Sequence, residues 1–206
     1  GTRDHRPFRK ARRMTRALVL FAHPCAESFG AALHDTVVAA LRGRGWDVDD
    51  CDLYAEGFAP VLTAEERRGY HDTGTNCAPV QDHVDRLRVA EALVLVHPVW
   101  NFGFPAILKG YLDRVFLPGV SFRLEEGRVK PNLTNIRRLA AVATYGGPWH
   151  RAFLMGDPPR RIMGRVLRGV TLAPRYRYLA LYDMNRATDA DRGRFLARVA
   201  REMEAF

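Results

Sequence analysis

The sequence predicts an α/β fold in which helices cover both faces of a parallel sheet. Short apolar runs alternate with segments of helical periodicity, and this alternation repeats five times along the 206 residues. The intervals between apolar runs are long enough for the crossover helices that parallel strands need. No internal repeat or low-complexity linker interrupts the pattern, which favours one domain.

The predicted strands are short apolar or alternating runs bounded by polar residues. RALVLFA and ALVLVHP are continuous apolar runs, as expected for buried strands, whereas WDVDDCDLY alternates. The five strands are expected at residues 16–22, 46–54, 92–98, 136–147 and 175–184.

The predicted helices carry apolar residues three and four positions apart. Ser28 and Thr188 stand where an N-cap is expected, and acidic residues follow Thr188 in the first turn. The connection over 55–76 has no sustained period, and 157–170 has no clear assignment. The helices are expected within residues 28–45, 80–91, 103–116 and 188–206.

The positive charge is concentrated at the beginning of the sequence. The net charge is +9, and residues 1–16 contain seven Lys or Arg against one Asp, which leaves +3 for the rest. We expect residues 1–14 to form a disordered basic extension and residues 15–206 to form the single domain. A basic arm can bind nucleic acid, but only Phe8 offers a ring for stacking, so we expect no nucleic-acid partner.

Other features narrow the class of protein. No run of 18 apolar residues occurs, and the first residues lack the apolar section of a secretory signal, so we expect a cytoplasmic protein without a membrane span. Cys25, Cys51 and Cys77 show no CxxC spacing, which predicts neither a disulfide framework nor a metal site.

Three predicted strands end in loops of unusual composition: HPCAESFG, HPVWNFGFP and TYGGPWH. Ligands of open parallel sheets bind beyond the carboxyl ends of the strands, so the three loops predict one cleft. In the first loop, Ser28 and the free N–H groups of a helix start suit a phosphate, although an ordinary capped helix would look the same. The GxGxxG fingerprint is absent.

The second loop places Trp100, Phe102 and Phe104 directly after a buried strand. Large aromatic side chains at a loop need a covering partner, and a flat heteroaromatic cofactor or a dimer contact would serve. The glycine pair at 146–147 would let the backbone approach a ring edge closely.

Together, FAHPCAESFG, HPVWNFGFPAILKGYLDRVF and TYGGP resemble the flavodoxin-like NAD(P)H:quinone oxidoreductases, the DT-diaphorase-like flavoproteins, in their short bacterial form. The order and spacing match over residues 17–205. The resemblance implies a three-layer sandwich with strand order 2-1-3-4-5, bound FAD or FMN, and a homodimer with active sites at the subunit interface. It also implies two-electron reduction of a quinone-like acceptor by NAD(P)H as co-substrate, in a ping-pong mechanism.

The resemblance assigns site residues by loop. Those of the first loop would hold the flavin phosphate, and those of the other two would lie along the ring system. Gly30 stands where the longer diaphorases often carry Asn, which leaves FAD and FMN open. The cofactor-binding residues are expected to be His23, Ser28, Phe29, Gly30, Pro98, Val99, Trp100, Asn101, Phe102, Thr144, Tyr145, Gly146 and Gly147.

The catalytic Tyr and His of the long diaphorases would fall on Ala152 and Pro158 here, so Tyr145 and His150 are the candidate catalytic residues. Two other functions remain open. One is an electron-carrying flavodoxin, which the aromatic loop and the basic charge disfavour. The other is a regulatory flavoprotein subunit of a potassium-efflux-type transporter, associated peripherally with the membrane.

Overall fold

The central sheet of the computed structural model, which describes residues 14–206, has five parallel strands. The predicted basic extension lies outside the described residues except for Met14. The strand order is β2-β1-β3-β6-β7, so the predicted order 2-1-3-4-5 is confirmed. The strands are β1 (Arg16–Phe21), β2 (Asp47–Asp52), β3 (Ala92–Val99), β6 (Arg138–Tyr145) and β7 (Arg175–Leu181).

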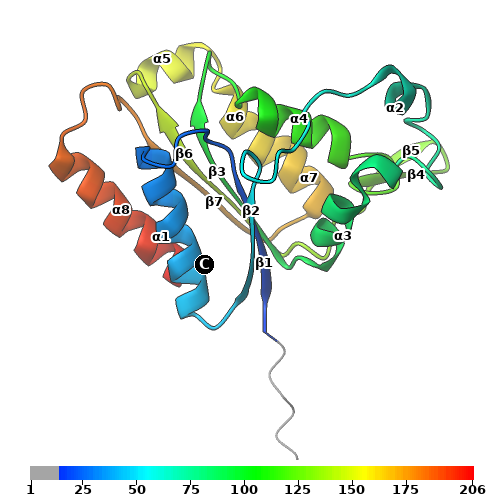
Figure 1. Ribbon diagram of the computed structural model, residues 1–206, viewed down its shortest axis with the longest axis horizontal. Coiled ribbons are helices and arrows are strands. Elements are labelled where there is room, and N and C mark those ends of the chain that lie inside the picture. Colours follow the sequence, from blue (N-terminus) through cyan, green and yellow to red (C-terminus); the bar gives the residue numbers. More distant parts are fainter. Residues whose placement is uncertain (1–13) are drawn as a thin grey trace, which may run out of the picture.

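Helices cover both faces of this sheet, which confirms the three-layer sandwich (Figure 1). One face packs against α1 (Phe29–Gly43) and α8 (Asp189–Glu204). The opposite face packs against helices from three separate stretches of the chain. These are α3 (Gln81–Val89), α4 (Ala106–Val115) and the consecutive α6 (Pro158–Arg161), η2 (Ile162–Leu167) and α7 (Arg168–Thr171).

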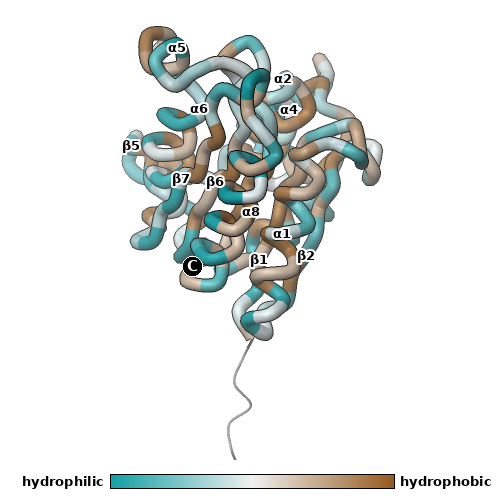
Figure 2. The backbone as a smooth tube through the Cα atoms, turned by 90° about the vertical axis from the view of Figure 1, so that its left-hand side faces the viewer, coloured by the Kyte–Doolittle hydropathy of each residue, from teal (hydrophilic) through white to brown (hydrophobic). Residues whose placement is uncertain are grey.

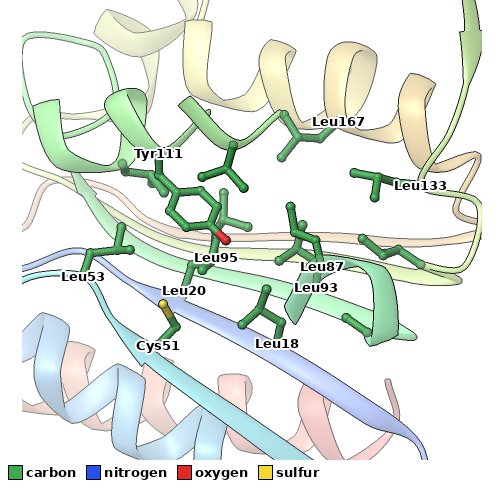
Figure 3. Close-up of a cluster of buried hydrophobic side chains, with 14 of the residues drawn as sticks. Leu18, Leu20, Cys51, Leu53, Leu87, Leu93, Leu95, Tyr111, Leu133 and Leu167 are labelled. Atoms are coloured by element: carbon green, nitrogen blue, oxygen red, sulfur yellow. The ribbon is translucent and has the colours of Figure 1, made fainter. Parts of the chain in front are cut away.

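The side-chain alternation of the strands divides the core in two. Leu18 and Leu20 of β1 point to the α3–α4 face, whereas Val19 and Phe21 point to the α1–α8 face. All four are buried. Figure 3 shows the first cluster, in which Tyr111 of α4 lies over the leucines of β1 and β3.

Several short elements were not predicted from the sequence. They are η1 (Ala78–Val80), α2 (Ala64–Arg68), the hairpin β4 (Phe122–Glu125) and β5 (Arg128–Pro131), and α5 (Trp149–Leu154). The five residues of α2 are too few for a visible period. That helix depends on a capping box instead, in which Thr63 N–H donates to Glu66 Oε2 over 2.8 Å and Glu66 N–H donates to Thr63 Oγ1 over 3.1 Å.

The long connection between β2 and α3 packs closely against α4. Gly110 of α4 faces Pro60, and a Cβ at position 110 would lie only 2.2 Å from the Pro60 carbonyl oxygen. Backbone atoms cannot move aside cheaply, so this helix position accepts only glycine.

We therefore predict that Gly110→Ala lowers the free energy of unfolding by about 1–3 kcal/mol, because the connection must separate from α4. Chemical denaturation followed by circular dichroism measures the change. The matched control is Gly43→Ala, since nothing lies within 4 Å of a Cβ at the end of α1. Equal effects of the two substitutions would contradict the packing argument.

Candidate functional site

The first loop ends in a capped helix whose leading N–H groups are available. Ser28 Oγ accepts a hydrogen bond from Ala31 N–H over 3.1 Å. Within residues 14–206, the N–H groups of Phe29 and Gly30 donate no hydrogen bond. Because α1 has 15 residues, the positive end of its dipole lies at these donors. Of the residues predicted to bind the phosphate, Phe29 and Gly30 therefore have N–H groups without a partner at this helix end, and their binding role stays a prediction.

His23 joins the first loop to the second. Its Nδ1 accepts a hydrogen bond from Cys25 N–H over 3.0 Å, so in the neutral ring the proton is on Nε2, which is then a donor. The His23 ring meets Trp100 edge to face, with centroids 5.8 Å apart. A Cβ at Gly30 would lie 3.4 Å from the same ring.

The second loop is a tight turn with an unusual backbone. Trp100 and Gly103 exchange both backbone hydrogen bonds, at 3.1 and 2.9 Å. Asn101 and Phe102 between them have φ values of 47° and 60°, in the left-handed region that glycine usually occupies. Such strain costs about 1–3 kcal/mol per residue and concentrates at functional sites. Neither residue's N–H donates a hydrogen bond within the described part of the chain.

The third loop is hydrogen-bonded through its backbone to the loop that follows β7. The carbonyl oxygens of Tyr145, Gly146 and Gly147 accept hydrogen bonds from three consecutive N–H groups, those of residues 183–185, at 2.8–3.2 Å. The N–H groups of Gly146 and Gly147 make no hydrogen bond to any described residue. The glycine pair therefore keeps both donors for a ligand while its carbonyl groups are fixed.

The sheet register brings the second and third loops together. Pro98 pairs with Thr144 and Val99 with Tyr145 at the ends of β3 and β6. Beyond them lies a cavity of about 270 Å³. Its lining includes six predicted residues together with four that were not predicted. The lining residues are Val99, Asn101, Phe102, Tyr145, Gly146, Gly147, Pro148, Arg151, Ala152 and Asn185.

The hydroxyl of Tyr145 is committed to a buried network. It donates to Asp157 Oδ1 over 2.6 Å and lies 2.6 Å from the hydroxyl of Tyr178. Asp157 Oδ2 also accepts from Arg160 Nε, at 3.1 Å, and from the hydroxyl of Tyr182, at 3.3 Å. Burial raises the pKa of Tyr145 far above its ordinary value, so this hydroxyl stays protonated.

The two catalytic candidates therefore differ in place. Tyr145 borders the cavity, but its hydroxyl is hydrogen-bonded to Asp157 and Tyr178. His150 is exposed on α5 and does not line the cavity. The structure does not bring the two polar groups together, and the catalytic role of each stays a prediction.

Arg151 and Asn185 line the cavity but were missed by the sequence analysis. Arg151 makes no ion pair with any residue of 14–206, so its positive charge faces the cavity unopposed. A signal for Asn185 was present in the sequence, because it follows the fifth predicted strand at the same edge of the sheet. Arg151 carried no such signal, since α5 is too short to be predicted.

His97, the second of the two strand-end His-Pro pairs, is a core residue. Its Nδ1 lies 2.9 Å from the Pro98 carbonyl oxygen, and its ring meets Phe104 edge to face. A carbonyl can only accept, so Nδ1 carries the proton. Nε2 is buried with no partner among the described residues, and burial lowers the pKa of His97 to about 4.

One group of possible metal ligands lies away from this cavity. The ligand atoms of Cys51, Glu56 and His83 are within 4.8 Å of one another. Both carboxylate oxygens of Glu56 already accept from Arg86, at 2.7 and 3.0 Å. Burial raises the pKa of the Cys51 thiol, which disfavours the thiolate that a metal needs. We interpret the group as part of the ion-pair network between β2 and α3.

Comparison with known proteins identifies the family. The model of the family with a flavodoxin-like fold matches residues 15–194, which is most of the sequence. The chain belongs to the flavodoxin-like family. The predicted resemblance to its NAD(P)H:quinone oxidoreductase branch is thereby confirmed, since the relatives found carry such names.

Among the relatives, an uncharacterised NAD(P)H oxidoreductase of Haemophilus influenzae is 39% identical over 111 residues, which is 53% of this chain and 54% of that protein. NAD(P)H dehydrogenase [quinone] 1 of Rattus norvegicus is 29% identical over 147 residues, or 64% of this chain and 54% of the rat protein. The aligned part of this chain thus spans about half the length of these relatives.

Solved structures agree on the fold. Smu.1420 from Streptococcus mutans has a TM-score of 0.83 at 25% identity, covering 93% of this chain and 100% of that one. The NAD(P)H:quinone oxidoreductase from Methanothermobacter marburgensis has a TM-score of 0.81 at 23% identity, covering 93% and 98% of the two chains.

The low pKa of His97 predicts acid sensitivity. In the unfolded chain a histidine binds its proton near pH 6.5, whereas the buried His97 does so only near pH 4. Between these values the unfolded state binds more protons, so stability falls as the pH is lowered, by up to about 3 kcal/mol.

Urea unfolding of the parent and of His97→Phe at pH 7 and pH 4.5 measures this contribution. The variant keeps an aromatic ring beside Phe104 but cannot titrate, so its loss of stability on acidification is expected to be smaller by about 2–3 kcal/mol. Parallel pH dependence of the two proteins would contradict the assignment.

Proposed function

We propose that this protein is a flavin-dependent NAD(P)H oxidoreductase that transfers two electrons to quinones or related acceptors. The observation that carries the proposal is the strained turn at Asn101–Phe102. These two residues line the same cavity as Gly146 and Gly147, and the N–H groups of all four make no hydrogen bond within residues 14–206. Backbone donors at the edge of a cavity suit the ring nitrogens and oxygens of a flat heteroaromatic cofactor.

The residues present fit a flavin at both ends. Toward the phosphate they offer the first N–H groups of α1, the hydroxyl of its N-cap residue Ser28 and the Nε2 donor of His23. Toward the ring system they offer exposed aromatic surface, since Trp100 and Phe102 are 42% and 39% exposed. Edge-to-face contact between His23 and Trp100 joins the two ends into one site.

A bound flavin would supply the hydride chemistry, and this chain would supply position and electrostatics. Asn101, Phe102, Gly146 and Gly147 would orient the ring through their backbone N–H groups. The unpaired guanidinium of Arg151 would favour negative charge in the cavity. Tyr145 would fix the backbone of the third loop, because its hydroxyl is fastened to Asp157.

We further propose a ping-pong order. The second and third loops border one cavity of about 270 Å³, and NAD(P)H and the acceptor would approach in turn the same face of the ring held there. FAD and FMN both remain compatible with the residues of the first loop. The bound flavin is therefore to be identified by mass after release.

The homodimer that the resemblance implies is also a proposal. An apolar groove of about 300 Å³ runs between α4 and η2, bordered by Leu112, Phe116, Phe122 and Val166, and we propose it as the subunit contact. We place the protein in the cytoplasm. The three cysteines are free thiols, which accords with a reducing compartment.

Steady-state kinetics test the proposed activity. Purified holoprotein is expected to oxidise NADH or NADPH when menadione is added, with parallel double-reciprocal plots that mark alternating substrates. The proposed reaction would be contradicted if the nucleotide were oxidised without an added acceptor. It would also be contradicted if neither NADH nor NADPH were oxidised when menadione is present.

Trp100→Ala is expected to reduce the flavin retained after gel filtration by at least about tenfold, because the ring system of the flavin would lose the indole of Trp100 as its aromatic neighbour. The fold should be kept, since Trp100 is exposed. Trp149→Ala is the matched control, because Trp149 is also exposed but its ring contacts His150 and Phe153 of α5 and not His23 of the first loop. Equal flavin content in both variants would remove Trp100 from the site.

A further inference from the structure

The carboxylate of Asp157 is the centre of a hydrogen-bond network beside the candidate site. Its Oδ1 accepts from the hydroxyl of Tyr145 over 2.6 Å, and its Oδ2 accepts from Arg160 Nε over 3.1 Å and from the hydroxyl of Tyr182 over 3.3 Å. The side chain of Asp157 is only 14% exposed, so water competes little for these bonds. One carboxylate therefore joins the end of β6, the residue after β7 and helix α6.

The direction of the hydrogen bonds follows from the chemistry of the network. Tyr145 has one hydroxyl proton and donates it to Asp157, so Tyr178, whose hydroxyl lies 2.6 Å from that of Tyr145, donates to Tyr145. The rings of Tyr145 and Tyr182 lie together, with centroids 4.4 Å apart and planes inclined by 32°. The Arg160 guanidinium lies 4.3 Å from the centroid of the Tyr178 ring. Tyr145 is thus held both at its hydroxyl and along its ring.

The backbone that carries this carboxylate is strained. Gly156 and Asp157, which connect α5 to α6, have φ values of 81° and 44°, and only glycine adopts such values without cost. The N–H of Asp157 donates to the carbonyl oxygen of Ala152 over 2.8 Å, which fixes the connection to α5. Strain of this kind is unfavourable for folding and concentrates at functional sites. It indicates that Asp157 does more than stabilise the fold.

The network adjoins the lining of the cavity. Tyr145 borders the cavity and packs with Ala152 of α5 in a small apolar cluster, which Val99 of the second loop joins. Arg151 lines the same cavity, and its Cδ would lie 3.7 Å from a Cβ at Gly147. Figure 2 shows α5 and α6 at the end of the molecule opposite the beginning of β1, where the parallel strands end. The network is therefore attached to the parts of the chain that carry the donors of the third loop.

We propose that Asp157 is a positioning residue of the candidate site. It does not line the cavity, so it acts through Tyr145. Tyr145 directly precedes Gly146 and Gly147, whose N–H groups make no hydrogen bond within residues 14–206. With Tyr145 fixed, these two donors are held for the ring of a bound flavin, and they favour the reduced form more strongly because it carries more negative charge. This inference deepens the proposed function and rests on it.

Two other roles of Asp157 predict different results. A carboxylate that acted only by its charge would disfavour the reduced ring, so its removal would favour that form. A carboxylate that only stabilised the fold would affect the binding of oxidised and reduced flavin alike. A positioning role predicts that its removal disfavours the reduced form. All contacts of the network join residues of one chain, so they do not require a second copy.

The test is the reduction potential of flavin bound to the full chain, measured against that of free flavin. The difference gives the ratio of the dissociation constants of oxidised and reduced flavin. Asp157→Asn is expected to lower this ratio by at least about tenfold, which is about 30 mV in the potential, because an amide cannot accept from all the donors around it. Tyr145→Phe changes no charge and keeps the ring, and it is expected to lower the ratio equally.

The two substitutions are then combined. If Asp157 acts through the Tyr145 hydroxyl, the double variant should have the ratio of either single variant, within about threefold. Multiplied effects in the double variant would show two independent roles and overturn the proposal. A higher ratio in Asp157→Asn would assign a charge effect, and equal weakening of both forms would assign a purely structural role, so either result would also overturn it.

Glu202→Gln is the matched control, because the carboxylate of Glu202 on α8 accepts from Arg177 Nε over 3.2 Å and neither residue lines the cavity. Its ratio should equal that of the parent, and an equal change in this control would refute the proposal. Circular dichroism verifies that each variant is folded. If Asp157→Asn does not fold, Tyr145→Phe decides alone, and an unchanged ratio in that variant counts against the proposal.

The same measurement separates this inference from the proposed function. A parent that binds neither FMN nor FAD contradicts both. A parent that binds flavin, with a ratio that neither Asp157→Asn nor Tyr145→Phe alters, contradicts only the role of Asp157.

Discussion

The candidate site depends on a backbone constraint at the end of β3. Asn101 and Phe102 both adopt a left-handed conformation that non-glycine residues avoid, and the two hydrogen bonds between Trp100 and Gly103 hold them there. The strain of about 1–3 kcal/mol per residue must be offset by the rest of the fold. The result is a turn that borders the cavity and whose two N–H groups make no hydrogen bond within the described residues, beside aromatic surface that a ligand can cover.

The surrounding structure makes this geometry rigid. β3 and β6 are interior strands with continuous burial, so the loops that follow them leave the sheet in fixed register. A second layer then fastens the third loop. N–H groups of the segment after β7 donate to the carbonyl oxygens of the third loop, and Asp157 accepts a hydrogen bond from the hydroxyl of Tyr145. Donors fixed before a ligand arrives need no reorganisation, so they can favour negative charge on a bound ring.

Periodic signals of buried parallel strands and amphipathic helices were sufficient to predict the parallel sheet and the three loops. The strand order was predicted from the resemblance to the quinone oxidoreductases and not from periodicity. Prediction from the sequence was less successful where an element has few residues or where a contact joins residues far apart in the chain. Helix α5 has six residues, of which only Ala152 is buried, so its sequence is too short and too evenly exposed to show the apolar periodicity of a helix. The commitment of the Tyr145 hydroxyl to Asp157 and Tyr178 joins residues up to 33 positions apart, and no local pattern encodes such a contact. Asn185 could have been found by treating the fifth strand end like the other three.

The most direct test of the account is the binding of flavin by the purified protein. The absorption spectrum as isolated, followed by calorimetric titration of the flavin-free protein with FMN and with FAD, measures it. We predict a yellow protein, or stoichiometric binding of at least one of the two flavins with a dissociation constant of about 1 μM or less. A colourless protein that binds neither flavin in this range would contradict the assignment of the three loops.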